Sequence, residues 1–402
     1  MIQSKEYKKV LKMPKGKDKS KEFNKLNKKY GLTEYSLHKY VKPMQHFFKK
    51  NIDSFTAQKI ATRAFNTFKK HMFHEAKRVH FKKYGELNSL EGKSNGTGIK
   101  FQDNRLVWNK LEVPAIIKKN DEYAQIALEN RIKYCRILRR FIKGKYKYYI
   151  QLVLEGVPPI KINKKTGEIK NTIGNGRVGI DIGTQTIAIS SEIDVKLLEL
   201  APEVNNIEKE KRILLRKLDR QRRANNPNKY NKDGTIKRGN KDRWIKSNKY
   251  IKTQNELREL QRKQADIRKQ SHERLANYIL GLGNEIYVED MNYKGLQSRA
   301  KETTVNKKTG RNNKKKRFGK SLANKAPSMF LTILDNKLKF NGSQLYKIDT
   351  WSVKASQYNH IEDKYIKKNL NERWNDFGNC KIQRDLYSAF SIMNVKDNLK
   401  EI

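Results

Sequence analysis

The chain has 402 residues, about two to four times a typical domain, so we expect two or three domains. Its 90 basic and 42 acidic residues give a net charge of +48, which favours a polyanionic partner, above all nucleic acid. No stretch approaches the roughly 18 apolar residues of a membrane span, and no signal peptide is recognisable. We therefore expect a cytoplasmic protein with no membrane partner. Two cysteines, Cys135 and Cys380, exclude a disulfide framework and a four-cysteine zinc site.

The N-terminal half is predicted to combine helices with a small antiparallel sheet. Its first fifty residues are rich in lysine and are typical of a mobile or phosphate-facing segment. Asp53 or Ser54 is a candidate N-cap of a long helix. Apolar residues at helical spacing from Phe65 to Val79 predict that one face of this helix packs on a core.

Two hairpins are predicted after this helix. Asp103-Asn104 is a turn signal inside the segment 99–108, which has short apolar runs on both sides. Lys143-Gly144-Lys145 separates two longer strands in the segment 132–154, where apolar and aromatic residues alternate with others.

Pro158-Pro159 and the glycine-containing stretch 163–176 predict a boundary, which divides the chain into domains 1–170 and 171–402. The second part opens with a strand and contains a long basic helical insert over 205–283. The other elements expected there are strands at 178–183, 186–190, 285–290 and 344–348, a helix at 327–341 and a final helix from 384.

Three acidic residues lie in or beside apolar elements. Asp181 is inside the strand Gly179-Ile180-Asp181-Ile182-Gly183, Glu289 ends another strand, and Asp385 opens the last helix. A buried carboxylate is costly unless it is paired or binds a metal. In a phosphate-attracting protein this predicts Mg²⁺-dependent phosphodiester cleavage, in which two ions about 4 Å apart activate water and stabilise the leaving oxygen. The two glycines would let a nucleic-acid backbone approach closely.

Each acid also has a structural interpretation. An isolated acid at a strand end commonly serves as a cap, a turn residue or an ion-pair partner, and Asp385 suits the positive end of a helix dipole. Asp290 follows Glu289 and points to the opposite face of an extended strand, so we interpret it as a structural residue or as one that supports the metal ligands without binding the metal.

Three motifs taken together resemble the RuvC motifs of TnpB proteins, a family encoded by bacterial insertion sequences and similar to type V CRISPR effectors. They are Gly179-Ile180-Asp181-Ile182-Gly183, Val288-Glu289-Asp290-Met291-Asn292 and Arg384-Asp385-Leu386-Tyr387-Ser388-Ala389. The resemblance covers about 170–402 well and the N-terminal half only by architecture. It implies an α/β multidomain protein with an RNase H-like RuvC nuclease domain. It also implies an N-terminal β-barrel wedge domain with a helical recognition insert at about 30–92.

The function implied by the resemblance is that of an RNA-guided DNA endonuclease of a transposable element, with a guide RNA and double-stranded DNA as partners. Asp181, Glu289 and Asp385 match the family's catalytic acids, which hold two Mg²⁺ ions, or Mn²⁺. The protein would then lie in the bacterial cytoplasm and associate with the nucleoid when bound to DNA. The sequence leaves the oligomeric state open.

A guide RNA and a heteroduplex need a long basic channel. The candidate nucleic-acid contacts are Arg216, Lys217, Arg220, Arg222, Arg223, Lys314, Lys315, Lys316 and Arg317. Arg384, beside the acids, has two equal interpretations: contact with the scissile phosphate, or support of the last helix.

The chain departs from the family between the second and third motifs, where the family has a zinc ribbon of four cysteines. The matching region, 350–384, contains one histidine, His360, and one cysteine, Cys380, too few for a tetrahedral zinc site. We therefore expect a degenerate ribbon and no zinc. Gln383 and Tyr387 also stand where the family often has Asp and Asn.

Three other functions remain open from the sequence. A nuclease-dead RNA-guided regulator would generally have lost its RuvC acids, whereas all three are present here. A transposase, or another transposon-associated DNA-binding protein, could use the same fold and acids and would join DNA ends without a guide. A basic structural or RNA-chaperone protein would explain the charge but not the placement of the acids.

Overall fold

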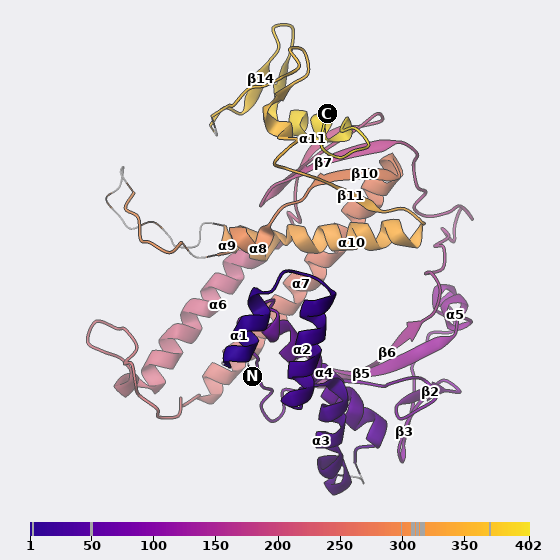
Figure 1. Cartoon of the computed structure of the whole chain (residues 1–402), viewed down its shortest axis with the longest axis vertical. Coiled ribbons are helices and arrows are strands. Elements are labelled where there is room, and N and C mark those ends of the chain that lie inside the picture. Colours follow the sequence, from indigo (N-terminus) through magenta and orange to yellow (C-terminus); the bar gives the residue numbers. More distant parts are fainter. Residues whose placement is uncertain are drawn as a thin grey trace. The chain divides into compact units, whose positions relative to one another are not determined.

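The chain folds into two compact units, Met1–Pro159 and Ile160–Ile402, each with its own hydrophobic cores (Figure 1). The computed structural model describes residues 1, 4–48, 51–298, 300–306, 310, 313, 318–369 and 371–402. Within these ranges, no helix has the length and apolar character needed to cross a membrane.

The N-terminal segment of unit 1 is helical in the part that the structure describes, which corrects the mobile alternative, whereas the phosphate-facing alternative stays a prediction. It forms α1 (Lys5–Lys12), α2 (Lys17–Lys29) and α3 (Glu34–Phe47). The apolar residues of this region are few, but they meet in one small core with a residue of the next helix. The buried members of this core are Tyr7, Val10, Phe23, Leu26 and Met72.

The next helix, α4 (Ser54–Met72), begins as predicted, because Asp53 Oδ1 accepts a hydrogen bond from the Thr56 amide at 2.9 Å. It ends at Met72, so the end of the predicted apolar stripe, up to Val79, lies beyond the helix. A short helix, α5 (Glu122–Leu128), completes the helical part of unit 1.

Two antiparallel three-stranded sheets complete unit 1, and the described residues contain no closed barrel, which corrects the expected wedge barrel. Both predicted hairpin turns are confirmed: φ is 50° at Asp103 and 56° at Asn104, and 49° at Lys143 and 80° at Gly144, as type I′ turns require. The strands are β1 (Ser89–Glu91), β5 (Ile132–Ile142) and β6 (Lys145–Leu154) in one sheet, and β2 (Lys100–Gln102), β3 (Arg105–Trp108) and β4 (Leu111–Pro114) in the other.

A mixed five-stranded sheet in the order β11-β10-β7-β8-β9 forms the centre of unit 2. Strands β7 (Arg177–Ile182), β10 (Glu285–Glu289) and β11 (Leu345–Ile348) run parallel, whereas β8 (Thr186–Ser191) is antiparallel to its two neighbours. The sequence does not predict β9 (Val195–Glu199), because this edge strand is mostly exposed and lacks an alternating apolar pattern.

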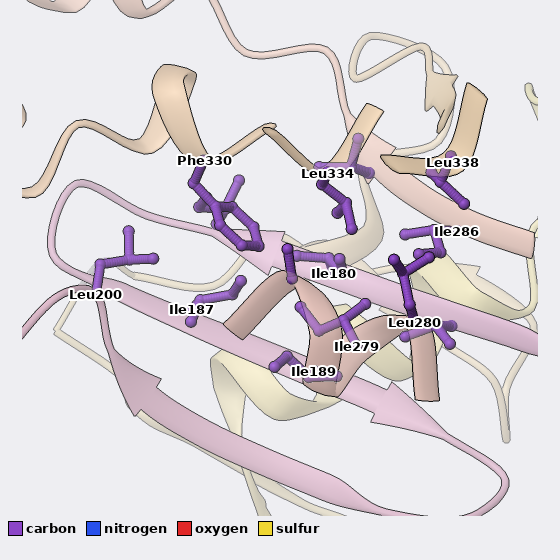
Figure 2. Packing of buried hydrophobic residues seen from close by; sticks show 14 of the residues in the cluster. Ile180, Ile187, Ile189, Leu200, Ile279, Leu280, Ile286, Phe330, Leu334 and Leu338 are labelled. Atoms are coloured by element: carbon purple, nitrogen blue, oxygen red, sulfur yellow. The ribbon is translucent and has the colours of Figure 1, made fainter. Parts of the chain in front are cut away.

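One face of this sheet packs against α7 (Asn248–Leu282) and α10 (Pro327–Phe340) (Figure 2). The sheet contributes β-branched side chains, which favour extended backbone. Helix α10 contributes a stripe of apolar side chains at every fourth residue. The labelled core residues are Ile180, Ile187, Ile189, Leu200 and Ile286, with Ile279 and Leu280 of α7 and Phe330, Leu334 and Leu338 of α10. The opposite face is covered by α11 (Arg384–Met393).

The basic insert is a pair of contacting helices, α6 (Val204–Asn225) and α7, joined by a loop that contains the 3₁₀ helix η1 (Pro227–Lys229). The expected ribbon region contains two small hairpins and another 3₁₀ helix. The remaining elements are α8 (Tyr293–Leu296), α9 (Gly319–Lys325), η2 (Ala355–Gln357), β12 (Tyr358–Asn359), β13 (Lys364–Tyr365), β14 (Trp374–Asp376) and β15 (Lys381–Gln383).

Candidate active site

Asp181 and Glu289 lie at the ends of neighbouring parallel strands. In the register of β7 and β10, Ile180 is the partner of Val288. The next residue on each strand is acidic, so the two carboxylates are level and share one face of the sheet. Ile180 and Val288 point to the other face and are buried in the core. The alternation along each strand therefore directs both carboxylates away from that core.

Gly179 allows α11 to pack directly on the face that carries Asp181. A Cβ atom at Gly179 would lie 2.0 Å from the carbonyl oxygen of Ala389 and 2.4 Å from the amide nitrogen of Met393. The expected role of this glycine is thus corrected, because the backbone that approaches it is the chain's own helix. A Cβ atom at Gly183 would meet only ordinary contacts, the nearest being Thr186 Oγ1 at 3.5 Å.

The start of α11 is fixed by Gln383. Its side-chain oxygen accepts hydrogen bonds from the amides of Asp385, at 2.7 Å, and Leu386, at 2.9 Å. Its side-chain nitrogen donates to Asp385 Oδ2 at 3.1 Å. A residue that the sequence marks only as a departure from the family motif therefore caps the helix and orients the third carboxylate.

The three carboxylates are electrostatically coupled through Asp181. Burial is the main cause that raises the pKa of Asp181 to about 6. The negative charge of Asp385 raises this pKa further, whereas a hydrogen bond from Ser388 and the positive charge of Arg384 lower it. Burial also raises the pKa of Glu289 to about 7, with a further contribution from Asp181. The structure thus brings together the three acids that the sequence singled out. Acids with raised pKa values that share a site are typical of catalytic groups.

Tyr293, at the start of α8, also belongs to this group, although its sequence context carries no signal. Burial raises its pKa, and the charges of Asp181 and Glu289 raise it further. Its hydroxyl is buried and has no hydrogen-bond partner in the part of the chain that the structure describes. The hydroxyl is therefore available to a group that enters the site.

Among the described residues, no three histidine, cysteine or acidic side chains are close enough to hold a metal ion as they stand. The donors nevertheless fit Mg²⁺ or Mn²⁺, which prefer carboxylate oxygens. No described cationic side chain lowers the pKa of Glu289. All three acids are only partly buried, so an ion can reach them from solvent. A divalent cation would supply the positive charge that this group of acids needs.

Two neighbours of the acids have mainly structural contacts. Asp290 is exposed and its Oδ1 lies 3.1 Å from Lys347 Nζ, in agreement with a structural role. Arg384 donates a hydrogen bond from Nη1 to the carbonyl oxygen of Asn369 at 3.0 Å. This contact attaches Arg384 to the loop before β14, and both interpretations of Arg384 stay predictions.

Aromatic rings attach the expected ribbon region to α11. The buried Tyr387 ring lies 4.9 Å from the ring of Phe377 and 5.7 Å from that of His360, between centroids. Tyr387 Oη accepts a hydrogen bond from the His360 amide at 3.0 Å and shares another with His360 Nδ1 at 2.8 Å. Cys380 is exposed. The two hairpins are thus attached to α11 through an aromatic cluster centred on Tyr387.

We expect Tyr387→Phe to lower the free energy of unfolding by about 1–2 kcal/mol, because it leaves two polar groups of His360 without their partner. Thermal unfolding followed by circular dichroism measures this loss, with Tyr365→Phe, at an exposed tyrosine of β13, as the control. A zinc-selective chelator should leave the midpoint of the wild-type protein unchanged. Equal midpoints for both variants would contradict the role of this hydroxyl.

The candidate nucleic-acid contacts on α6 fall into two groups. Arg222 and Arg223 both pair with Asp219, at 2.7 and 2.9 Å, and pack on Trp244 and Tyr230, so they hold the loop between α6 and α7. The other three candidates on this helix are exposed and lie outside that cluster: Arg216, Lys217 and Arg220. The other four, Lys314, Lys315, Lys316 and Arg317, lie outside the described residues.

No family model and no curated protein sequence matches the chain. Two solved structures are similar to it in part. A complex of Cas12f1 with sgRNA and target DNA matches with a TM-score of 0.46 and 11% identity, over 85% of this chain and 71% of the other. A CRISPR-Cas12f ternary complex matches with a TM-score of 0.31 and 12% identity, over 90% and 75% of the two chains. At these TM-scores the likenesses establish neither a shared fold nor a shared activity.

Proposed function

We propose that the chain is an RNA-guided DNA endonuclease of a transposable element, which cleaves its target by divalent-metal-dependent phosphodiester hydrolysis. The observation that carries this proposal is the coupling of Asp181, Glu289 and Asp385 on one face of the unit 2 sheet. The net charge of +48 supports nucleic acid as the substrate. The resemblance of the three ordered motifs to those of TnpB proteins supports cleavage directed by a guide RNA.

The residues of the site would divide into metal ligands, residues that position these ligands, and residues that bind phosphates. Asp181, Glu289 and Asp385 would hold Mg²⁺ or Mn²⁺, which supplies activation of water and stabilisation of the leaving oxygen. Gln383 keeps the carboxylate of Asp385 oriented, and Gly179 keeps α11 on the sheet. The exposed basic residues of α6 would bind backbone phosphates without reading sequence.

The guide requirement is tested by expressing the protein with its flanking genomic DNA, purifying it and sequencing the bound RNA. We expect one abundant RNA that ends in variable guide sequence. Heterogeneous RNA, or none, would contradict the guided function. Joining of a donor end to target DNA without RNA would then identify a transposase.

Cleavage at limiting Mg²⁺ is expected to increase with pH between about 5 and 8. The pKa is raised to about 6 at Asp181 and to about 7 at Glu289, so both side chains are protonated below this range and charged above it. Protons and divalent cations compete for the carboxylates, so a higher Mg²⁺ concentration should move the midpoint to lower pH. Single-turnover rates measured across pH and Mg²⁺ concentration test this. A midpoint independent of Mg²⁺ would contradict metal binding by these acids.

A further inference from the structure

The end of the hairpin β5–β6 extends beyond its sheet in unit 1. The third strand, β1, pairs with β5 only from Arg136 to Leu138. The two hairpin strands continue to pair with each other up to Ile142 and Lys145. No other strand in the described part of the chain pairs with this ribbon, residues 139–149, although the Arg139 amide donates a hydrogen bond to the Asn88 carbonyl oxygen just before β1.

The ribbon combines exposed aromatic rings with positive charge. The exposed fractions are 53% for Tyr146, 68% for Tyr148 and 42% for Tyr149. The whole segment 131–154 contains no acidic residue. The cations of the ribbon are Arg139, Arg140, Lys143, Lys145 and Lys147.

Tyr148 differs from the other two tyrosines in having a free ring. The guanidinium of Arg139 lies 4.6 Å from the ring centre of Tyr146, and that of Arg140 lies 5.6 Å from the ring centre of Tyr149. The Tyr148 ring has no such contact with a described residue. In the strand register, Tyr148 lies directly opposite Arg139, so one face of the ribbon presents a free aromatic ring beside a cation.

We propose that this ribbon binds an unpaired nucleic-acid strand, with a base stacked on Tyr148 and phosphates bound by the lysines around the turn. Stacking on aromatic side chains next to cations is the usual way in which proteins bind single strands, because every base has a flat face. The charge would also attract an acidic protein. A base, however, needs only the flat face of an exposed ring such as Tyr148, whereas a peptide side chain gains most from burial in a pocket. The proposal concerns unit 1 alone and does not depend on cleavage.

The test is fluorescence anisotropy of a labelled, unstructured oligouridine with the full-length protein in EDTA at several salt concentrations. We expect Tyr148→Ala to weaken binding about tenfold and Tyr148→Phe to retain it, since phenylalanine keeps the ring. Tyr148→Ala should leave the salt dependence unchanged. Lys145→Ala should instead reduce the slope of log affinity against log salt by about one.

An abasic strand with the same number of phosphates separates stacking from charge. Wild type and Tyr148→Ala should bind it equally. A 5-iodouridine strand crosslinked by ultraviolet light should label the peptide that contains Tyr148. The proposal is overturned by any of three results: unchanged oligouridine binding by Tyr148→Ala, equal losses on the normal and abasic strands, or labelling confined to other peptides.

A nucleic-acid duplex and polyglutamate are two further probes, which test whether the ribbon binds a different partner. A duplex bound with the same dependence on Tyr148 would overturn recognition of an unpaired strand. Polyglutamate binding that is weakened by Tyr148→Ala, with oligouridine binding unchanged, would assign the ribbon to an acidic protein. Because these measurements need neither guide nor Mg²⁺, their failure is distinguishable from failure of the endonuclease proposal.

Discussion

Replacing Asp181 with asparagine is expected to abolish target cleavage while the protein still binds its RNA and DNA. The amide keeps the size of the side chain but removes the negative charge that would hold a divalent cation. Without the metal, the transition state loses several kcal/mol of stabilisation, and the cleavage rate should fall at least about 10³-fold. Single-turnover cleavage of a guide-matched DNA measures the rate. Filter binding of the same complex measures what remains of nucleic-acid affinity.

Asp290→Asn is the matched control for this variant. Asp290 belongs to the same motif as Glu289, but it is exposed and pairs with Lys347, so we expect less than about a twofold change in rate. Thermal unfolding of metal-free Asp181→Asn provides a second readout. Its midpoint should equal or exceed that of the wild type, because the substitution removes a partly buried charge and its repulsion from Asp385. Wild-type cleavage by Asp181→Asn would refute the catalytic assignment.

Gly179→Ala is expected to destabilise unit 2 severely. The new methyl group would lie 2.0 Å from the carbonyl oxygen of Ala389, so either α11 or β7 must move. The two nearest atoms, the Ala389 carbonyl oxygen and the Met393 amide nitrogen, belong to the backbone, so no side-chain rotation relieves the clash. We expect the free energy of unfolding to fall by about 3 kcal/mol or more. For a unit of this size the thermal midpoint should fall by about 6 °C or more.

Gly183→Ala is the control, because it also replaces a glycine of the segment 179–183 by alanine but creates no steric clash. Its nearest contacts would be Thr186 Oγ1 at 3.5 Å and Thr186 O at 3.6 Å, so we expect a change in midpoint within about 2 °C. If the two variants unfolded at the same temperature, the close packing of α11 on β7 would be contradicted. Residual cleavage by soluble Gly179→Ala should also be low, since displacement of α11 moves Asp385.

The features that the sequence predicted correctly depend on neighbouring residues. Asp103-Asn104 and Lys143-Gly144 are turns of two residues with positive φ angles, which strand twist favours and which Asp, Asn and Gly tolerate well. Asp53 caps α4 through an amide three residues away. The strands that carry Asp181 and Glu289 are short apolar runs, which are visible without any knowledge of their partners.

The features that the sequence did not predict depend on contacts between distant residues. The Tyr7 hydroxyl donates a hydrogen bond to the carbonyl oxygen of Met72, so the helices near the N-terminus are stabilised by a core that no local window contains. Tyr293 follows Glu289 closely in the chain, but it lies near Asp181 only because β10 is adjacent to β7. The role of Gly179 likewise becomes visible only when α11 is present. The sequence marks Gln383 only as a departure from the family motif, because its capping role depends on the geometry of the helix start.

The packing of α11 on β7 also determines when the site forms during synthesis. Of the three acids, Asp181 leaves the ribosome first, Glu289 follows about a hundred residues later, and Asp385 of α11 comes last. Until α11 has been made, β7 and β10 have no helix on their acidic face, and the third carboxylate does not exist. A nascent or prematurely terminated chain therefore carries the basic helices without a complete site. Any capacity to cut is delayed until α11 has been translated and has packed on β7.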